Sequence, residues 1–128
     1  MRDPRRRLGD EGEGRAEAYL RQQGFRILGR NVRSPLGELD LVADDRGVLV
    51  FVEVKRRRTG TFGGAIEAVD ARKRAKLIQL AAQYLAQHRI RNCACRFDVV
   101  LIQDDAESAE AVQHITNAFD LDGDDLRW

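Results

Sequence analysis

Residues 37–58, GELDLVADDRGVLVFVEVKRRR, decide the fold that this sequence predicts. Apolar and polar residues alternate on both sides of the turn formers at positions 44–47, which is typical of a β-hairpin. The alternating apolar positions are Leu39, Leu41, Ala43, Val48, Val50, Val52 and Val54. A loop of two or four residues would place Ala43 opposite Val48, and we expect the apolar side chains to form a core face.

Charged residues are found among the other positions of this hairpin. The same pairing puts Glu38 opposite Glu53, with Asp40 diagonal to Glu53. The residues that then share one face are Glu38, Asp40, Glu53 and Lys55, whereas a loop of three or five residues would break this parity. Carboxylates about 4 to 5 Å apart repel by roughly 3 to 4 kcal/mol per pair at an effective dielectric constant of about 20. Lys55 offsets only one charge, so a divalent cation with oxygen ligands, such as Mg²⁺, is the predicted compensation.

The charge distribution along the chain is uneven. The 128 residues are 43% hydrophobic, which fits one compact domain. Residues 1–103 carry a net charge of +8 and residues 104–128 a net charge of −7. A basic body favours a polyanionic partner such as DNA, although an acidic extension can also serve only to keep a protein in solution.

No stretch of the sequence is typical of a signal peptide or a transmembrane helix, so we expect a cytoplasmic protein without a membrane partner. Cys93 and Cys95 are the only cysteines, and they are too few for a zinc site. We interpret them as reduced thiols that pack in the interior.

The remaining periodicities predict an α/β fold in which a mixed sheet is flanked by helices. The expected elements are a helix over 10–23, a strand over 25–32, the hairpin, a helix from an Asp70 cap to about 88, a strand over 96–102 and a short element over 114–119. The predicted organisation is a basic flexible arm at 1–8, a domain at 9–119 and an acidic tail at 120–128.

Several charged residues outside the hairpin are candidates for the same site. Glu13 lies on the inward side of the first predicted helix, but Glu17 shares part of that stripe, and periodicity leaves the choice open. Lys73 lies on the inward side of the second helix, where it can meet a phosphate or a carboxylate. Arg56, Arg57 and Arg58 directly follow the acidic face; arginine runs are usually solvated, but this position favours contact with phosphate.

Two further polar residues have structural interpretations. Asp98 interrupts the apolar run RFDVVLI at 96–102, and we expect it to form a structural ion pair or a cap rather than to act in catalysis. His88 and His114 have no companions at metal-ligand spacing, so neither is assigned to chemistry.

Asp40, a spacer of twelve residues and then Glu53-Val54-Lys55 resembles the active-site pattern of the PD-(D/E)-x-K nuclease superfamily. The pattern is most similar to archaeal Holliday-junction resolvases, in which a helix supplies a glutamate eleven residues before a Gly-Phe pair. Gly24-Phe25 assigns that glutamate to Glu13. The GELD, FVEVK and RFD segments are similar to the bacterial YraN family of endonuclease-like proteins over residues 9–119, although Leu39 stands where the superfamily name has proline.

This resemblance implies a restriction-endonuclease or resolvase-like core in the order α-β-β-β-α-β. It implies a Mg²⁺-dependent or Mn²⁺-dependent endodeoxyribonuclease that hydrolyses DNA phosphodiester bonds, with branched or Holliday-junction-like DNA as substrate and a homodimer as the working form. The implied metal ligands are Asp40, Glu53, Glu13 and Glu38, and the implied catalytic residues are Asp40, Glu53, Lys55 and Glu13. The implied contacts to the DNA backbone come from Arg56, Arg57, Arg58 and Lys73. The alternative is a non-catalytic DNA-binding subunit of a nucleic-acid processing complex.

Overall fold

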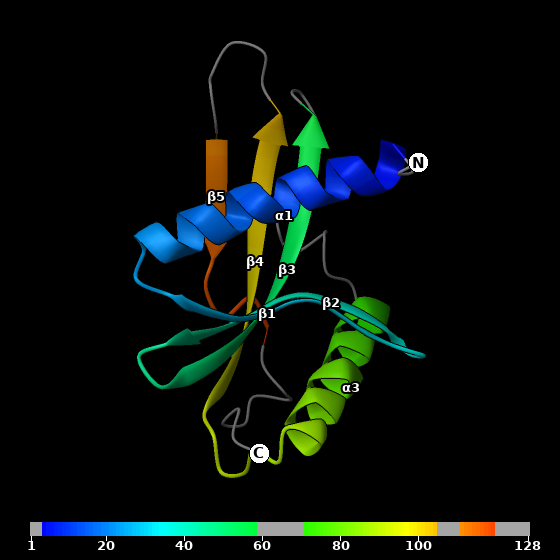
Figure 1. The fold of residues 1–128 in the computed structure, drawn as a ribbon, viewed down its shortest axis with the longest axis vertical. Helices are drawn as coiled ribbons and strands as arrows, with labels where there is room; N and C mark the ends of the chain where they lie inside the picture. The colour runs from blue at the N-terminus through cyan, green and yellow to red at the C-terminus, as the bar shows by residue number, and fades with distance from the viewer. Residues whose placement is uncertain (1–3, 59–70, 105–110, 120–128) are drawn as a thin grey trace.

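A computed structural model describes residues 4–58, 71–104 and 111–119. Its elements are α1 (Pro4–Gln22), β1 (Arg26–Ser34), β2 (Gly37–Asp45), β3 (Val48–Arg58), α3 (Ala71–Gln87), β4 (Cys95–Asp104) and β5 (Ala111–Ile115). The five strands form one sheet in the order β1-β2-β3-β4-β5 (Figure 1). Only β3 and β4 are parallel, and the other neighbours are antiparallel. The predicted α/β fold with a mixed sheet is thereby confirmed, and β5 begins slightly before the predicted C-terminal element.

The first helix differs from the prediction at its start. It begins at Pro4 instead of near Asp10. Proline is well suited to the first turn of a helix, because the missing N–H has no intrahelical partner there. The predicted glycine-rich connection, the Asp70 cap and the acidic tail at 120–128 lie outside the described residues.

The hairpin between β2 and β3 has a loop of two residues, Arg46 and Gly47. Both have positive φ values, 53° and 92°, as a type I′ turn requires. Asp45 pairs with Val48 and Ala43 pairs with Val50, so the predicted pairing of Ala43 with Val48 is wrong by two residues. A shift of two residues keeps every side chain on its predicted face. The charged residues therefore stay together despite the wrong register.

Two apolar clusters cover the two faces of the sheet. On one face, Ala16 and Leu20 of α1 pack with residues of β2, β3 and β4. On the other face, α3 packs through Leu77, Leu80 and Tyr84 on a second cluster. That second cluster includes Val42 and Phe51, which are two residues from Asp40 and Glu53 along the strands and so share their face of the sheet. The prediction of a single apolar face was therefore incomplete, because each face of the central strands is covered by its own helix (Figure 1).

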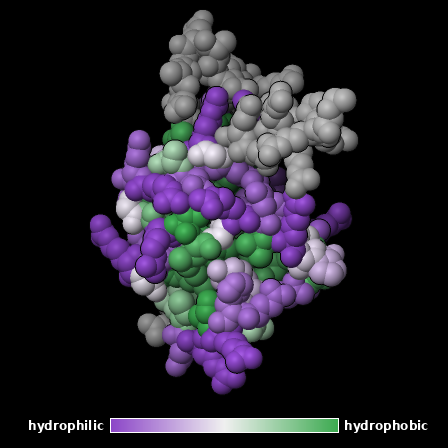
Figure 2. All heavy atoms as spheres, viewed as in Figure 1, coloured by the Kyte–Doolittle hydropathy of each residue, from purple (hydrophilic) through white to green (hydrophobic). Residues whose placement is uncertain are grey.

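The outward side of the C-terminal part of α1 is polar. In Figure 2 hydrophilic side chains cover this part of the helix, and hydrophobic ones lie below it. None of the helices among the described residues combines the length and the apolar content needed to span a bilayer.

Gly37 begins β2 and lies against α3. Its φ is +148°, and a Cβ atom added there would lie 2.8 Å from Lys76 Cε and 3.5 Å from Leu80 Cδ1. The side chain of Lys76 is flexible, but the backbone conformation is one that residues with a Cβ rarely adopt. Gly37 therefore lets the start of β2, which carries Glu38, approach α3 closely.

We expect Gly37→Ala to lower the free energy of unfolding by about 1 to 3 kcal/mol, because both the φ value and the contact with Lys76 become unfavourable. The matched control is Gly14→Ala in α1, where an added Cβ meets nothing within 4 Å. That substitution should raise the free energy of unfolding by about 0.5 to 1 kcal/mol. Urea denaturation of the two variants measures both values, and a Gly37→Ala variant as stable as the original chain would contradict the first.

Candidate functional site

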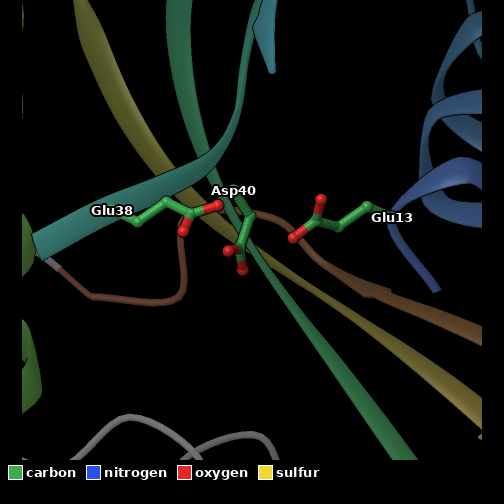
Figure 3. A group of neighbouring side chains, drawn as sticks. All are labelled: Glu13, Glu38 and Asp40. Atoms are coloured by element: carbon green, nitrogen blue, oxygen red, sulfur yellow. The ribbon is translucent and has the colours of Figure 1, made fainter. Parts of the chain in front are cut away.

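Three carboxylates from two elements meet at one point of the molecule. Glu13 comes from α1, and Glu38 and Asp40 come from β2. One oxygen of each lies within 4.8 Å of the others, and Figure 3 shows the three side chains pointing toward one another. All three are half-buried. The structure thus brings together three of the four residues predicted as metal ligands.

Asp40 stands where the regular pairing of β2 with β3 ends. The recorded pairs stop at Leu41 and Val52, and the next residues are joined through a side chain, because the N–H of Val54 donates to Asp40 Oδ2 over 2.8 Å. Continuing the register by one residue sets Asp40 opposite Glu53, whereas the sequence had predicted Glu38 there. Burial, and then the charge of Glu53, raise the pKa of Asp40 to about 8. At neutral pH a proton therefore occupies this carboxyl group.

Glu53 is the fourth predicted ligand and is only 7% exposed. Its Oε1 lies 2.5 Å from Nζ of Lys73 in α3 and 3.4 Å from Nζ of Lys55 in β3. A buried carboxylate requires such partners, because an unpaired charge in the interior costs several kcal/mol. Removing one partner of a buried ion pair typically lowers the stability of the fold by about 3 to 5 kcal/mol. Lys73, predicted to face a phosphate or a carboxylate, contacts a carboxylate here. Glu53 is thus held by cations beside the group of three acids.

The two lysines differ in how firmly they keep a proton. Burial lowers the pKa of Lys55, and the neighbouring amine of Lys73 lowers it further. For Lys73, burial opposes the charged form, but the hydrogen bond to Glu53 outweighs it and raises the pKa. The shorter contact of Lys73 with Glu53 agrees with this division. Lys73 is therefore the fixed cation of the site, and Lys55 is the amine that can more easily exchange a proton.

Glu17, the rival of Glu13 in the periodicity of α1, lies in another environment. Its carboxylate accepts hydrogen bonds from Arg21 Nε at 3.1 Å and from Arg30 Nη2 at 2.9 Å. These arginines are more than half exposed, so the group is a surface ion pair. Glu13 is the α1 carboxylate that the structure places beside Asp40.

The arginine run continues β3 past the site. Arg56 is half-buried, and the side chains of Arg57 and Arg58 lie outside the described part of the chain. Exposed cations are also present on the first turns of α3, where they flank Lys73 at Arg72, Arg74 and Lys76. The first turns of α3 thus form a basic surface next to the carboxylates.

One contact at the site was missed from the sequence. Arg33 Nε lies 3.5 Å from Glu38 Oε2, and these residues are paired across β1 and β2. Predicting this pair would have required the register of the β1–β2 hairpin, which the sequence does not give. The expectation for Asp98 is confirmed, because it forms an ion pair with Arg96 and accepts a hydrogen bond from the N–H of Asn117.

The donor set fits a hard divalent cation. Mg²⁺ and Mn²⁺ take oxygen ligands, and carboxylates that crowd one another are relieved when a cation replaces the proton they share. Glu13, Glu38 and Asp40 supply such oxygens, and Glu53 lies close enough to Asp40 to raise its pKa. The clustered side chains among the described residues thus supply oxygen ligands of the kind that such a cation takes.

The raised pKa of Asp40 makes stability depend on pH in a defined direction. Between about pH 4 and pH 8 the unfolded chain loses the Asp40 proton while the folded chain keeps it, so the free energy of unfolding falls as pH rises. Asp40→Asn keeps an oxygen for the Val54 N–H but cannot ionise. At pH 8 without metal, we expect this variant to be about 1 to 3 kcal/mol more stable than the original chain, with the gap closing toward pH 4. Urea denaturation in EDTA at pH 4, 6 and 8 measures the gap, and a gap that narrows as pH rises would contradict the assignment.

Comparison with known sequences agrees with the features described above. A family model described as "Uncharacterised protein family UPF0102" matches residues 12–102, which include Glu13, the central hairpin, α3 and most of β4. A UPF0102 protein of Syntrophotalea carbinolica is 47% identical over 116 residues, covering 91% of this chain and 94% of its own length. A UPF0102 protein of Moorella thermoacetica is also 47% identical over 116 residues, covering 90% of this chain and 97% of its own length. The chain therefore belongs to the UPF0102 family, to which the YraN resemblance of its sequence had pointed.

Proposed function

We propose that this chain is a metal-dependent endonuclease that hydrolyses DNA phosphodiester bonds with Mg²⁺ or Mn²⁺ as cofactor. One observation carries the proposal: Asp40, with a pKa raised to about 8, lies within 4.8 Å of two further carboxylates and next to a glutamate held by two lysines. A proton at Asp40 marks a position where a cation is favoured. Strongly perturbed groups gathered in this way are typical of functional sites.

Glu13, Glu38 and Asp40 would hold the cation, with Glu53 as the fourth carboxylate beside them. A bound divalent cation would act as a Lewis acid on a phosphoryl oxygen and would neutralise charge that develops there. The acidic residues also select for this class of ligand, because carboxylate oxygens suit Mg²⁺ and Mn²⁺ better than softer metals. Binding would offset the burial and the repulsion from Glu53 that together keep Asp40 protonated.

Lys55 and Lys73 would have different roles in the reaction. Lys55 has the lowered pKa and can accept a proton from the attacking water or hold that water in line. Lys73 keeps its charge and can stabilise the extra negative charge on the phosphate in the transition state. Their common contact with Glu53 fixes both amines beside the carboxylates.

The DNA backbone would run along the basic surface next to the site. The cations that would contact phosphates are Lys73, Arg56, Arg57 and Arg58, with the exposed Arg72, Arg74 and Lys76 of α3 as extensions. Contacts of this kind carry no base specificity and weaken as salt displaces them. Branched DNA, including four-way junctions, is the substrate class that we propose, and a homodimer would match the two equivalent strands of a junction.

The cleavage test uses supercoiled plasmid and four-way-junction DNA with Mg²⁺ or Mn²⁺. We expect Glu13→Gln, Asp40→Asn and Glu53→Gln each to reduce the cleavage rate by about 100-fold or more, since each removes a charge from the proposed metal site. The matched control is Glu17→Gln, which changes a carboxylate of the same helix that lies in a surface ion pair and should leave the rate unchanged.

Cleavage that persists in both Asp40→Asn and Glu53→Gln would contradict the proposed metal site. Tight DNA binding by the original chain without any cleavage would favour the non-catalytic DNA-binding subunit. Calorimetry that detects no divalent-ion binding would indicate instead that the carboxylates serve only to pair with neighbouring cations.

Metal affinity should depend on pH because the cation and a proton compete for Asp40. Below about pH 8 the carboxyl group must lose its proton first, so we expect the affinity for Mn²⁺ to rise about tenfold per pH unit and to level off above that pH. Titration calorimetry at pH 6, 7, 8 and 9 in two buffers of different ionisation enthalpy measures the affinity and counts the released protons. Affinity that is flat from pH 6 to pH 8 would show that the Asp40 proton does not compete.

A further inference from the structure

A second polar network lies between α1 and the sheet, apart from the carboxylate site. Its centre is Asp98 of β4, which is 1% exposed. Asp98 accepts hydrogen bonds from Arg96 Nε at 2.9 Å and Nη2 at 3.0 Å, from the N–H of Asn117 at 2.9 Å and from His114 Nε2 at 2.7 Å. Arg96 also donates to Asp45 Oδ2 over 3.1 Å and thus joins the end of β2 to the network. Every oxygen of Asp98 is engaged.

His114 connects this network to helix α1. Burial opposes ionisation of Asp98, but its hydrogen bonds with His114 and Arg96 lower its pKa, so its carboxylate only accepts hydrogen bonds. Nε2 of His114 must then carry its proton and donate a hydrogen bond to Asp98, and Nδ1, when the ring is neutral, accepts a hydrogen bond from the hydroxyl of Tyr19, 3.3 Å away. The ring of His114 also meets Tyr19 and Phe25 edge to face, with centroids 5.5 and 5.6 Å apart. A directed chain therefore runs from Tyr19 through His114 to Asp98.

Apolar packing and a surface ion pair also join α1 to the sheet, and both are weak in direction. Ala16 and Leu20 are fully buried, but apolar contacts fix depth better than angle. Glu17 pairs with Arg21 and with Arg30 of β1 at an exposed position, where ion pairs contribute at most about 1 kcal/mol. The Tyr19–His114 bond, in contrast, is both directional and partly buried.

The angle of α1 matters because Glu13 is on the same helix. Glu13 precedes Tyr19 by six residues, which is about 9 Å along the helix axis. A pivot of about 10° at Tyr19 would move Glu13 by roughly 1.5 Å, whereas functional side chains must be held to within about 0.5 Å. Figure 1 shows how α1 crosses β5, β4 and β3, with its C-terminal half over β5, the strand that carries His114. Anchoring that half controls where the N-terminal half lies.

We propose that Tyr19, His114 and Asp98 are positioning residues that fix the angle of α1 over the sheet and so hold the Glu13 carboxylate beside Asp40. The proposal rests on the proposed function in one respect, that Glu13 is a metal ligand. None of the three residues touches the metal or the substrate. They act through the helix on the geometry of the site.

Two variants remove the same link from opposite sides. Tyr19→Phe deletes the hydroxyl, and His114→Gln keeps an N–H for Asp98 but lacks the Nδ1 acceptor. We expect either to weaken Mn²⁺ binding by about tenfold, in the range known for residues that orient metal ligands, and the double variant to be no worse than either single one. The matched control is Tyr84→Phe in α3, which stacks on His88 in the other cluster and should leave Mn²⁺ affinity unchanged.

The orientation of α1 gives a second readout that needs no metal. Backbone residual dipolar couplings of the metal-free protein should report a changed angle between α1 and the sheet in Tyr19→Phe and none in Tyr84→Phe. If Tyr19→Phe lowers the melting temperature while Mn²⁺ affinity and helix angle both stay as in the original chain, the network is merely structural and the proposal is overturned. Tyr19→Phe alone decides this if His114→Gln does not fold.

The two readouts separate this proposal from the proposed function. An original chain that binds no Mn²⁺ would end the metal-dependent function. The angle between α1 and the sheet in Tyr19→Phe would then still test whether Tyr19 and His114 orient α1. An angle unchanged from that of the original chain would overturn the positioning role as well.

Discussion

Electrostatic repulsion among carboxylates is the constraint on which this structure depends. Glu13, Glu38, Asp40 and Glu53 are drawn together at the point where β2 and β3 stop pairing. Three of these acids are accommodated in different ways: Glu53 by two lysines, Glu38 by Arg33 and Asp40 by a retained proton. A fold that needed only stability would replace such a group with apolar residues at little cost. The concentration of charge is therefore best understood as a property of the site and not of the core.

The topology explains how the compensating cations reach the acids. Strands β3 and β4 are parallel, so the chain between them must cross from one end of the sheet to the other. Helix α3 lies on that crossover and packs against the face that carries Val42 and Phe51. Lys73, in its first turn, thereby reaches Glu53. The single parallel pairing in the sheet thus places the fixed cation of the site.

Much of the fold and of the candidate site could be predicted from the sequence. The period of two in the central hairpin grouped Glu38, Asp40, Glu53 and Lys55, and that grouping survived a register error because the error was an even number of residues. Periodicity could not separate Glu13 from Glu17, since both lie near one stripe of α1, and only their partners in space distinguish them. The link between Asp98 and His114 was beyond prediction, because it depends on β5 pairing with β4. The early start of α1 was missed because a run of arginines carries no apolar period.

The meander of β1, β2 and β3 has a consequence for the order in which the molecule assembles. Its contacts join residues close in sequence, and such hairpins form faster than pairings that must first close a long segment of chain, as β3 with β4 must. We therefore expect Glu38, Asp40 and Glu53 to come together before the crossover brings Lys73 to them. During that interval the acids would face one another without their main cation. The repulsion in the finished site would then also slow folding, and we expect pH and ionic strength to change the rate of folding as well as the final stability.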